Sequence, residues 1–314
     1  MAAGLPERRT GGYNKVATSL DDIGTRMTLF SSHPRQFSTN RYVYPVLSRR
    51  AGGVSVGVNL SPDQACNFRC VYCQVDRSLP PGDPVVDLER LAAELDETLE
   101  WVRSGRIFEG PRFCDAPPAL RRLNDIALSG DGEPTTCAHF EQAVDLCIAA
   151  RRRLGVADLK IVLITNATLF HRASVQRAMA ALDANGGEIW AKLDAGTEAY
   201  YRQVNRSSTP WRRILENLRD AALVRPLVLQ TLLVRMHGQG PTSEELDAYC
   251  DRLNEMVAAG GRIRLVQIHT IARRPAESWA TALCNTEVDA AVERVRARTG
   301  LAVAGFYGQM ESEA

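Results

Sequence analysis

The stretch that decides the fold is VSVGVNLSPDQACNFRCVYCQVDR, which runs from Val54 to Arg77. Its first residues are small or apolar and predict a short buried strand, and a polar loop follows. That loop carries Cys66, Cys70 and Cys73 in the spacing C-x3-C-x2-C. Three thiolates on one loop can hold three irons of a cubane cluster and leave the fourth iron open to a small molecule. The loop therefore favours a chemical site over a purely electron-storing one, for which four cysteines are usual.

A zinc site is the alternative interpretation of the three cysteines, because three thiolates and one histidine also form a closed tetrahedral site. The nearest following histidine is His139, far outside the short ligand spacing of a zinc ribbon. The spacing thus favours the cluster.

Further along the chain, short apolar runs alternate with longer amphipathic segments. The predicted strands cover residues 54–60, 125–128, 159–165, 188–193, 227–234 and 263–268. The predicted helices cover residues 88–102, 138–153, 173–184, 211–223, 244–258 and 287–298. Repeated βα units give a parallel sheet with right-handed crossovers, so we expect an α/β fold whose site lies at the carboxyl ends of the strands.

Composition agrees with an enzyme-sized α/β chain. The 314 residues are 45% hydrophobic and 24% charged, with a formal net charge of +1. The N-terminus lacks the apolar core of a signal peptide, and no run is long enough to span a bilayer, so we expect a cytoplasmic protein without a membrane partner. In a reducing compartment, the other five cysteines are expected to be buried small hydrophobes (Cys114, Cys137, Cys147, Cys250 and Cys284).

The cysteine spacing, with Tyr72 just before the last cysteine, resembles the signature loop of the radical S-adenosylmethionine (SAM) superfamily. The resemblance implies an incomplete (β/α)6 barrel with a [4Fe–4S] cluster on Cys66, Cys70 and Cys73. It further implies that SAM chelates the open iron, with Tyr72 among the cofactor contacts. An electron from a donor such as flavodoxin or ferredoxin would then yield a 5′-deoxyadenosyl radical that abstracts hydrogen from substrate.

A second motif follows the next predicted strand, in the run LSGDGEPT at residues 128–135. It resembles the glycine-glycine-glutamate element of the same superfamily, which binds the amino group of SAM. The resemblance makes Gly130, Asp131, Gly132 and Glu133 cofactor contacts. A plain Gly-Pro turn is the alternative. The superfamily often has Thr-Asn-Gly after the third strand. This chain matches the first two residues with Thr165-Asn166, which makes Asn166 a further candidate contact, and departs from the pattern at Ala167.

Polar residues near the ends of later strands complete the predicted site. Lys192 and Asp194 share one face of an apolar strand, where a charge is costly unless it is paired or faces a polar cavity. We predict that they are catalytic, with a Schiff base between Lys192 and a carbonyl substrate as one role. A structural salt bridge between them is the alternative. Gln230 and Gln267 are predicted cofactor contacts, whereas His269 is expected to be structural.

Several phrases over residues 50–275 look like the group of radical enzymes related to the tRNA wyosine-base synthases. The archaeal members of that group bind a second cluster through three cysteines upstream of the signature loop, and here no cysteine precedes Cys66. We therefore expect radical initiation to carry over and the wyosine reaction not to. Modification of tRNA or of a nucleoside stays a candidate function. Basic patches at residues 151–153 and 273–274 are its candidate contacts.

We predict three parts: an irregular N-terminal extension over residues 1–50 that acts as a lid, a radical SAM core over residues 51–275, and a C-terminal helix and tail over residues 276–314. The competing functional hypothesis is a non-catalytic iron–sulfur or zinc protein that senses redox state or passes electrons. It predicts that the protein has no SAM-dependent activity.

Overall fold

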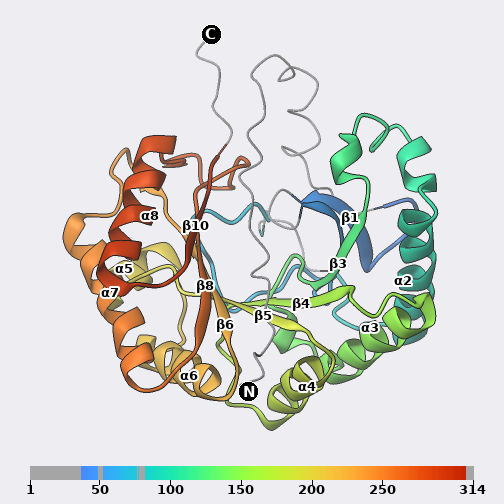
Figure 1. Cartoon of the computed structure of the whole chain (residues 1–314), viewed down its shortest axis with the longest axis horizontal. Coiled ribbons are helices and arrows are strands. Elements are labelled where there is room, and N and C mark those ends of the chain that lie inside the picture. The colour runs from blue at the N-terminus through green and yellow to red at the C-terminus, as the bar shows by residue number, and fades with distance from the viewer. Residues whose placement is uncertain (1–36, 49–51, 76, 78–81, 309–314) are drawn as a thin grey trace, which may run out of the picture.

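The core of the protein is one eight-stranded sheet that curls into an open half-barrel (Figure 1). The computed structural model describes residues 37–48, 52–75, 77 and 82–308. The strands lie in the order β1-β2-β3-β4-β5-β6-β8-β10. Their bounds are β1 (Val43–Ser48), β2 (Gly53–Val58), β3 (Leu123–Leu128), β4 (Lys160–Thr165), β5 (Glu188–Lys192), β6 (Leu227–Leu232), β8 (Ile263–His269) and β10 (Val303–Phe306). All neighbours pair in parallel except β1, which is antiparallel to β2.

Helices cover the convex face of the sheet (Figure 1). They are α2 (Leu88–Arg103), α3 (Phe140–Leu154), α4 (Ala173–Ala184), α5 (Glu198–Val204), α6 (Trp211–Val224), α7 (Ser243–Ala258) and α8 (Asn285–Thr299). Asp87 caps α2 by accepting from the backbone N–H groups of Glu89 and Arg90, and Thr242 caps α7 in the same way. No helix in the described part of the chain combines the length and apolar character that a bilayer crossing requires.

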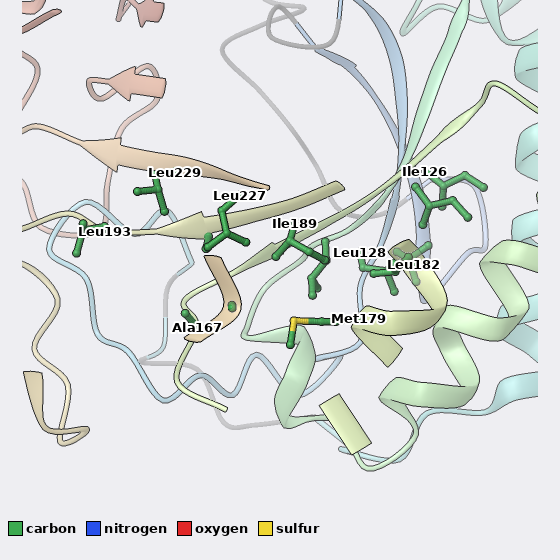
Figure 2. Close-up of a cluster of buried hydrophobic side chains, with 14 of the residues drawn as sticks. Ile126, Leu128, Ala167, Met179, Leu182, Ile189, Leu193, Leu227 and Leu229 are labelled. Carbon is green, nitrogen blue, oxygen red and sulfur yellow. The ribbon is translucent and has the colours of Figure 1, made fainter. Parts of the chain in front are cut away.

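Apolar side chains pack between the sheet and the outer helices. Figure 2 shows Ile126 of β3, Ile189 of β5 and Leu227 of β6 beside Met179 and Leu182 of α4. Each of these side chains is at most 2% exposed, which explains the nearly continuous apolar runs of the strands. Because this core covers the convex face of the sheet, a site can form only on its concave face and at the ends of its strands.

The predicted α/β half-barrel is confirmed, and the six predicted strands correspond to β2, β3, β4, β5, β6 and β8. Two strands of the eight-stranded sheet were not predicted. The first, β1, lies in a stretch that we expected to be irregular because Pro45 interrupts it, but a proline is tolerated on an edge strand. The second, β10, extends the sheet beyond residue 275. The division into three parts stays a prediction, and most of the proposed lid lies outside the described residues.

Shorter elements connect the units near the strand ends. They are the two-stranded pair β7 (Arg235–Met236) and β9 (Ala280–Thr281), and the 3-10 turns η2 (Arg106–Glu109), η3 (Pro118–Leu120) and η4 (Pro134–Thr136). The turn η4 follows the glycine-rich segment after β3, so it shapes the backbone that leads into α3.

Candidate active site

The three signature cysteines lie in one cavity at the carboxyl ends of the strands. The loop that carries them, residues 61–75, follows β2 directly and is called the cysteine loop below. Cys66, Cys70 and Cys73 are half-buried, form no disulfide, and line a cavity of about 550 Å³. The position agrees with the rule that parallel α/β folds place their sites at this edge of the sheet.

Backbone pairing fixes the cysteine loop against the C-terminal end of α5. The N–H of Arg69 donates to the carbonyl of Asn205 at 3.0 Å, and the N–H of Val71 donates to the carbonyl of Val204 at 2.9 Å. On the other side, Asn166 at the end of β4 donates through its amide to the side chain of Asn67 at 2.6 Å. The loop is thus held by residues about 100 and 135 positions away.

Two of the three thiols, those of Cys66 and Cys70, lie close to hydrogen-bond donors of the protein. Burial raises the pKa of Cys70 to about 12, and burial also raises the pKa of Cys66. Asn205 Nδ2 lies 3.5 Å from Cys70 Sγ, and the N–H of Phe68 lies 3.4 Å from Cys66 Sγ. Both groups are ready to donate to a thiolate, so this donor set fits an iron–sulfur cluster.

No three His, Cys, Asp or Glu side chains among the described residues converge on one point as a single metal ion would need. A cubane cluster has a different requirement, because each thiolate binds a different iron and the ligands surround the cluster.

The glycine-rich segment packs directly on the cysteine loop. A Cβ at Gly132 would overlap the carbonyl oxygen of Ala65, and one at Gly130 would overlap the side chain of Asn59. The same Asn59 donates from Nδ2 to Asp131 Oδ2 at 2.7 Å and accepts from the Asp131 N–H at 3.1 Å. Glycine is therefore needed here for close approach within the protein, while both glycines and Asp131 also line the cavity.

Glu133 lies at the centre of a saturated hydrogen-bond network. It is 3% exposed and accepts from the hydroxyls of Thr135 and Thr165, each at 2.6 Å, and from the N–H of Asn166 at 2.7 Å. Burial raises the pKa of Glu133 although these donors oppose the shift. The predicted contacts Glu133 and Asn166 are thus brought together by β3 and β4, and both line the cavity.

Asp194 binds the cysteine loop to the barrel. Its carboxylate accepts from the hydroxyl of Tyr72, from Asn205 Nδ2 at 2.8 Å and from the N–H of Leu232 at 2.9 Å. Lys192 Nζ lies 3.7 Å from the same carboxylate and 4.6 Å from the centre of the Tyr72 ring. Burial, together with the charge of Asp194, raises the pKa of Tyr72.

Lys192 and Tyr72 line the cavity, whereas Asp194 lies behind them. The predicted catalytic pair is therefore also an ion pair, as the alternative interpretation held, and its catalytic role stays a prediction.

The two glutamines meet across β6 and β8. Gln230 Nε2 donates to Gln267 Oε1 at 2.9 Å, and Gln230 faces the cavity while Gln267 supports it from behind. His269 stacks on Phe306 at 4.8 Å between ring centroids and also lines the cavity. Sequence reasoning missed Arg77 and Tyr44 as cavity residues, because a basic residue after a motif and a tyrosine on an unpredicted strand carried no signal.

Two predictions about surface and core residues need correction. Cys147 and Cys250 are buried as expected, but Cys137 is only partly buried and Cys114 and Cys284 are exposed. These three lie in the segments that connect the helices and strands. In the proposed basic patch at residues 151–153, Arg151 is buried and donates to the carbonyl of Asn185 at 2.6 Å. Arg152 and Arg153 also bind within the protein, to Asn185 and Asp96, so these three arginines already have partners in the fold.

Comparison with known proteins identifies related sequences. Residues 60–252 match the family model of the Radical SAM superfamily. The UPF0026 protein MJ1312 of Methanocaldococcus jannaschii is 28% identical over 169 residues, which cover 52% of this chain and 43% of that protein. The chain spans less than half the length of the curated relatives it matches.

Solved structures share the fold at low sequence identity. A radical SAM methyltransferase from Sphaerobacter thermophilus superposes with a TM-score of 0.58 at 13% identity, covering 85% of this chain and 70% of that one. A structure of TYW1 with a lysine-pyruvate adduct bound gives a TM-score of 0.50 at 14% identity, covering 83% of this chain and 85% of that one. At such identities the likeness is one of fold.

Proposed function

Because the chain belongs to the radical SAM superfamily, we propose that it cleaves SAM reductively at a [4Fe–4S] cluster held by Cys66, Cys70 and Cys73. The observation that carries this proposal is the convergence of the three thiols and the segment from Gly130 to Glu133 on one cavity. When bound, the cluster and SAM supply a 5′-deoxyadenosyl radical, which abstracts hydrogen from a substrate.

The residues of the chain hold and orient these groups. The three cysteines provide one thiolate for each of three irons, and Asn205 donates toward Cys70. Gly130, Asp131, Gly132, Glu133 and Asn166 are the proposed SAM contacts, with Tyr72, Gln230 and Gln267 beside or behind them. A carboxylate held by fixed donors, such as that of Glu133, needs little reorganisation when a cationic amino acid binds nearby.

Lys192 is the group that we propose for a carbonyl substrate. Its amine lines the cavity, and its side chain is 23% exposed. The lysine-pyruvate adduct of the similar TYW1 structure supports this chemistry. A Schiff base forms when the amine attacks the carbonyl carbon and water leaves, so the substrate must bring its carbonyl to the Lys192 amine, which lies 3.7 Å from Asp194. Cyanoborohydride reduction with a 2-oxo acid should add the acid to Lys192, as read by peptide mass spectrometry. Lys160, an exposed lysine at the far end of β4, is the control site and should stay unlabelled.

We propose a nucleoside or an RNA as the substrate class to test first, within the group of enzymes related to the wyosine synthases. Arg273 and Lys192 line the cavity, as does Arg77, so the cavity offers basic side chains to a phosphate-bearing substrate. The reaction also needs a low-potential electron donor, for which flavodoxin or ferredoxin are the candidates. Eight free cysteines support a reducing, cytoplasmic setting.

The decisive experiment is anaerobic reconstitution, followed by iron and sulfide analysis and dithionite-driven formation of 5′-deoxyadenosine. Cys70→Ala should abolish the product, whereas Cys284→Ala, at an exposed cysteine, should leave it unchanged. Wild-type protein that carries a cluster but forms no deoxyadenosine would support the non-catalytic alternative instead. If the wild type does form deoxyadenosine, an increase in its yield on addition of RNA or of a small-molecule fraction would identify the substrate class.

A further inference from the structure

Arg77 links the cysteine loop to the glycine-rich segment. It lies four residues after Cys73, and its side chain lines the same cavity as the three thiols. Its Nη2 donates to the backbone carbonyl of Asp131 at 2.7 Å and lies 3.8 Å from Cys73 Sγ. One guanidinium nitrogen is therefore within hydrogen-bonding reach of a predicted cluster ligand.

The other two nitrogens of Arg77 have no acceptor in the described part of the chain. Nε and Nη1 are shielded from solvent, and neither has a hydrogen-bond partner among the residues that the structure describes. Leaving a buried donor of a charged group unpaired is costly, so such an arrangement indicates that a partner is supplied from outside the chain.

Among the described residues, the acids that line the cavity are Asp131 and Glu133. Glu133 accepts from Thr135, Thr165 and Asn166, the Asp131 carboxylate accepts from Asn59, and neither forms an ion pair with Arg77. Because a guanidinium stays protonated at any working pH, a positive charge is permanently present beside Cys73. The loaded site must bring the matching negative charge.

We propose that Arg77 is a positioning residue for the cluster: it donates to the Cys73 thiolate and favours the reduced, more negative state of the cluster. The inference rests on the proposed function, since it assumes a cluster on the three cysteines. Hydrogen bonds to cysteine sulfur and nearby charge are two of the factors that set the potential of an iron–sulfur cluster. Arg77 makes the cluster easier to reduce and leaves hydrogen abstraction to other groups.

The test compares the midpoint potential of the cluster, measured without SAM by redox titration with electron paramagnetic resonance, in the wild type and two variants. Arg77→Gln should lower the ratio of reduced to oxidised cluster at a fixed potential at least tenfold, which is a shift of about 59 mV for one electron. Arg77→Lys keeps the charge but loses the planar donors, so the midpoint potential of its cluster should lie between those of the wild type and Arg77→Gln. Arg69→Gln is the matched control, because Arg69 is on the same loop but exposed, and its potential should equal that of the wild type.

Two results would overturn the proposal. The first is an equal potential in wild type and Arg77→Gln at equal iron and sulfide content. The second is an unchanged potential with weaker SAM binding to the oxidised cluster, which would assign Arg77 to the carboxylate of SAM. If Arg77→Gln assembles no cluster, Arg77→Lys decides by the same two measurements. Absence of deoxyadenosine from the wild type would refute the proposed function while leaving the potential shift intact, so the two failures are distinguishable.

Discussion

Replacement of Asp194 by alanine should destabilise the protein strongly, because this buried carboxylate is shared by several donors. It accepts from Tyr72, Asn205 and the N–H of Leu232, and its side chain has no exposed surface. Each of the three buried donors left without an acceptor costs about 1–3 kcal/mol. We expect the free energy of unfolding to fall by about 3–5 kcal/mol, since these costs overlap.

Urea unfolding of the cluster-free protein, followed by circular dichroism, measures this loss. Asp289→Ala is the control: Asp289 is exposed and accepts from the hydroxyl of Tyr307 at 2.6 Å, so its loss should change stability by less than about 0.5 kcal/mol. Lys192→Met should cost about 1 kcal/mol or less, because Lys192 is partly exposed and Asp194 keeps its other donors.

The reasoning is refuted if Asp194→Ala is no more costly than the Asp289 control. If Lys192→Met costs as much as Asp194→Ala, the stabilising element is the ion pair and the anchoring of the cysteine loop is secondary. The predicted loss in the free energy of unfolding is therefore much larger for Asp194→Ala than for Lys192→Met. The loss for Lys192→Met should equal or slightly exceed that of the Asp289 control.

Two further predictions concern packing and pH. Gly132→Ala should lower the free energy of unfolding by about 1–3 kcal/mol and reduce the iron content of the reconstituted protein, because the added Cβ overlaps the backbone of the cysteine loop. Gly240→Ala is the control, since a Cβ there meets open space, and its free energy of unfolding should equal that of the wild type. Glu188 is buried, which alone would raise its pKa, but hydrogen bonds from Lys160 and Arg264 hold the pKa below its ordinary value of 4.5. Glu188 should therefore stabilise the wild type relative to Glu188→Gln, with the whole difference in the free energy of unfolding present at pH values above 4.5. The difference should shrink as the pH falls through the lower pKa of the folded state. Unfolding curves of both proteins from neutral to acidic pH check this, and a pH-independent difference would contradict it.

Much of the barrel could be predicted because its signals are local. A parallel strand covered on both faces is an apolar run, and the six runs correspond to β2, β3, β4, β5, β6 and β8. The edge strands β1 and β10 lack that signal. β1 contains a proline, and β10 is a short segment with a glycine, so their pairing depends on neighbours far away in the sequence.

The site was predictable where one segment carries its chemistry. Cys66, Cys70 and Cys73 are recognisable within eight residues, but the side chains that hold their loop come from three other places in the chain, at Asn166, Asp194 and Asn205. A polar residue such as Asn205 has no distinctive sequence pattern, since its role is defined only by the carboxylate and the thiol that it meets. The same holds for Arg77, whose two unpaired nitrogens are a property of the folded cavity.

This division has a mechanistic consequence. The cysteine loop has no regular secondary structure of its own, so contacts from the residues just after β4 and β5 and from the C-terminal end of α5 set its shape. A cluster formed there is consequently oriented by the barrel that also forms the substrate cavity. Substitutions at Asp194 or Asn205 should therefore alter cluster retention before they alter the binding of any substrate. Substitutions at Lys192, which lines the cavity and contributes little to the anchoring, should do the reverse.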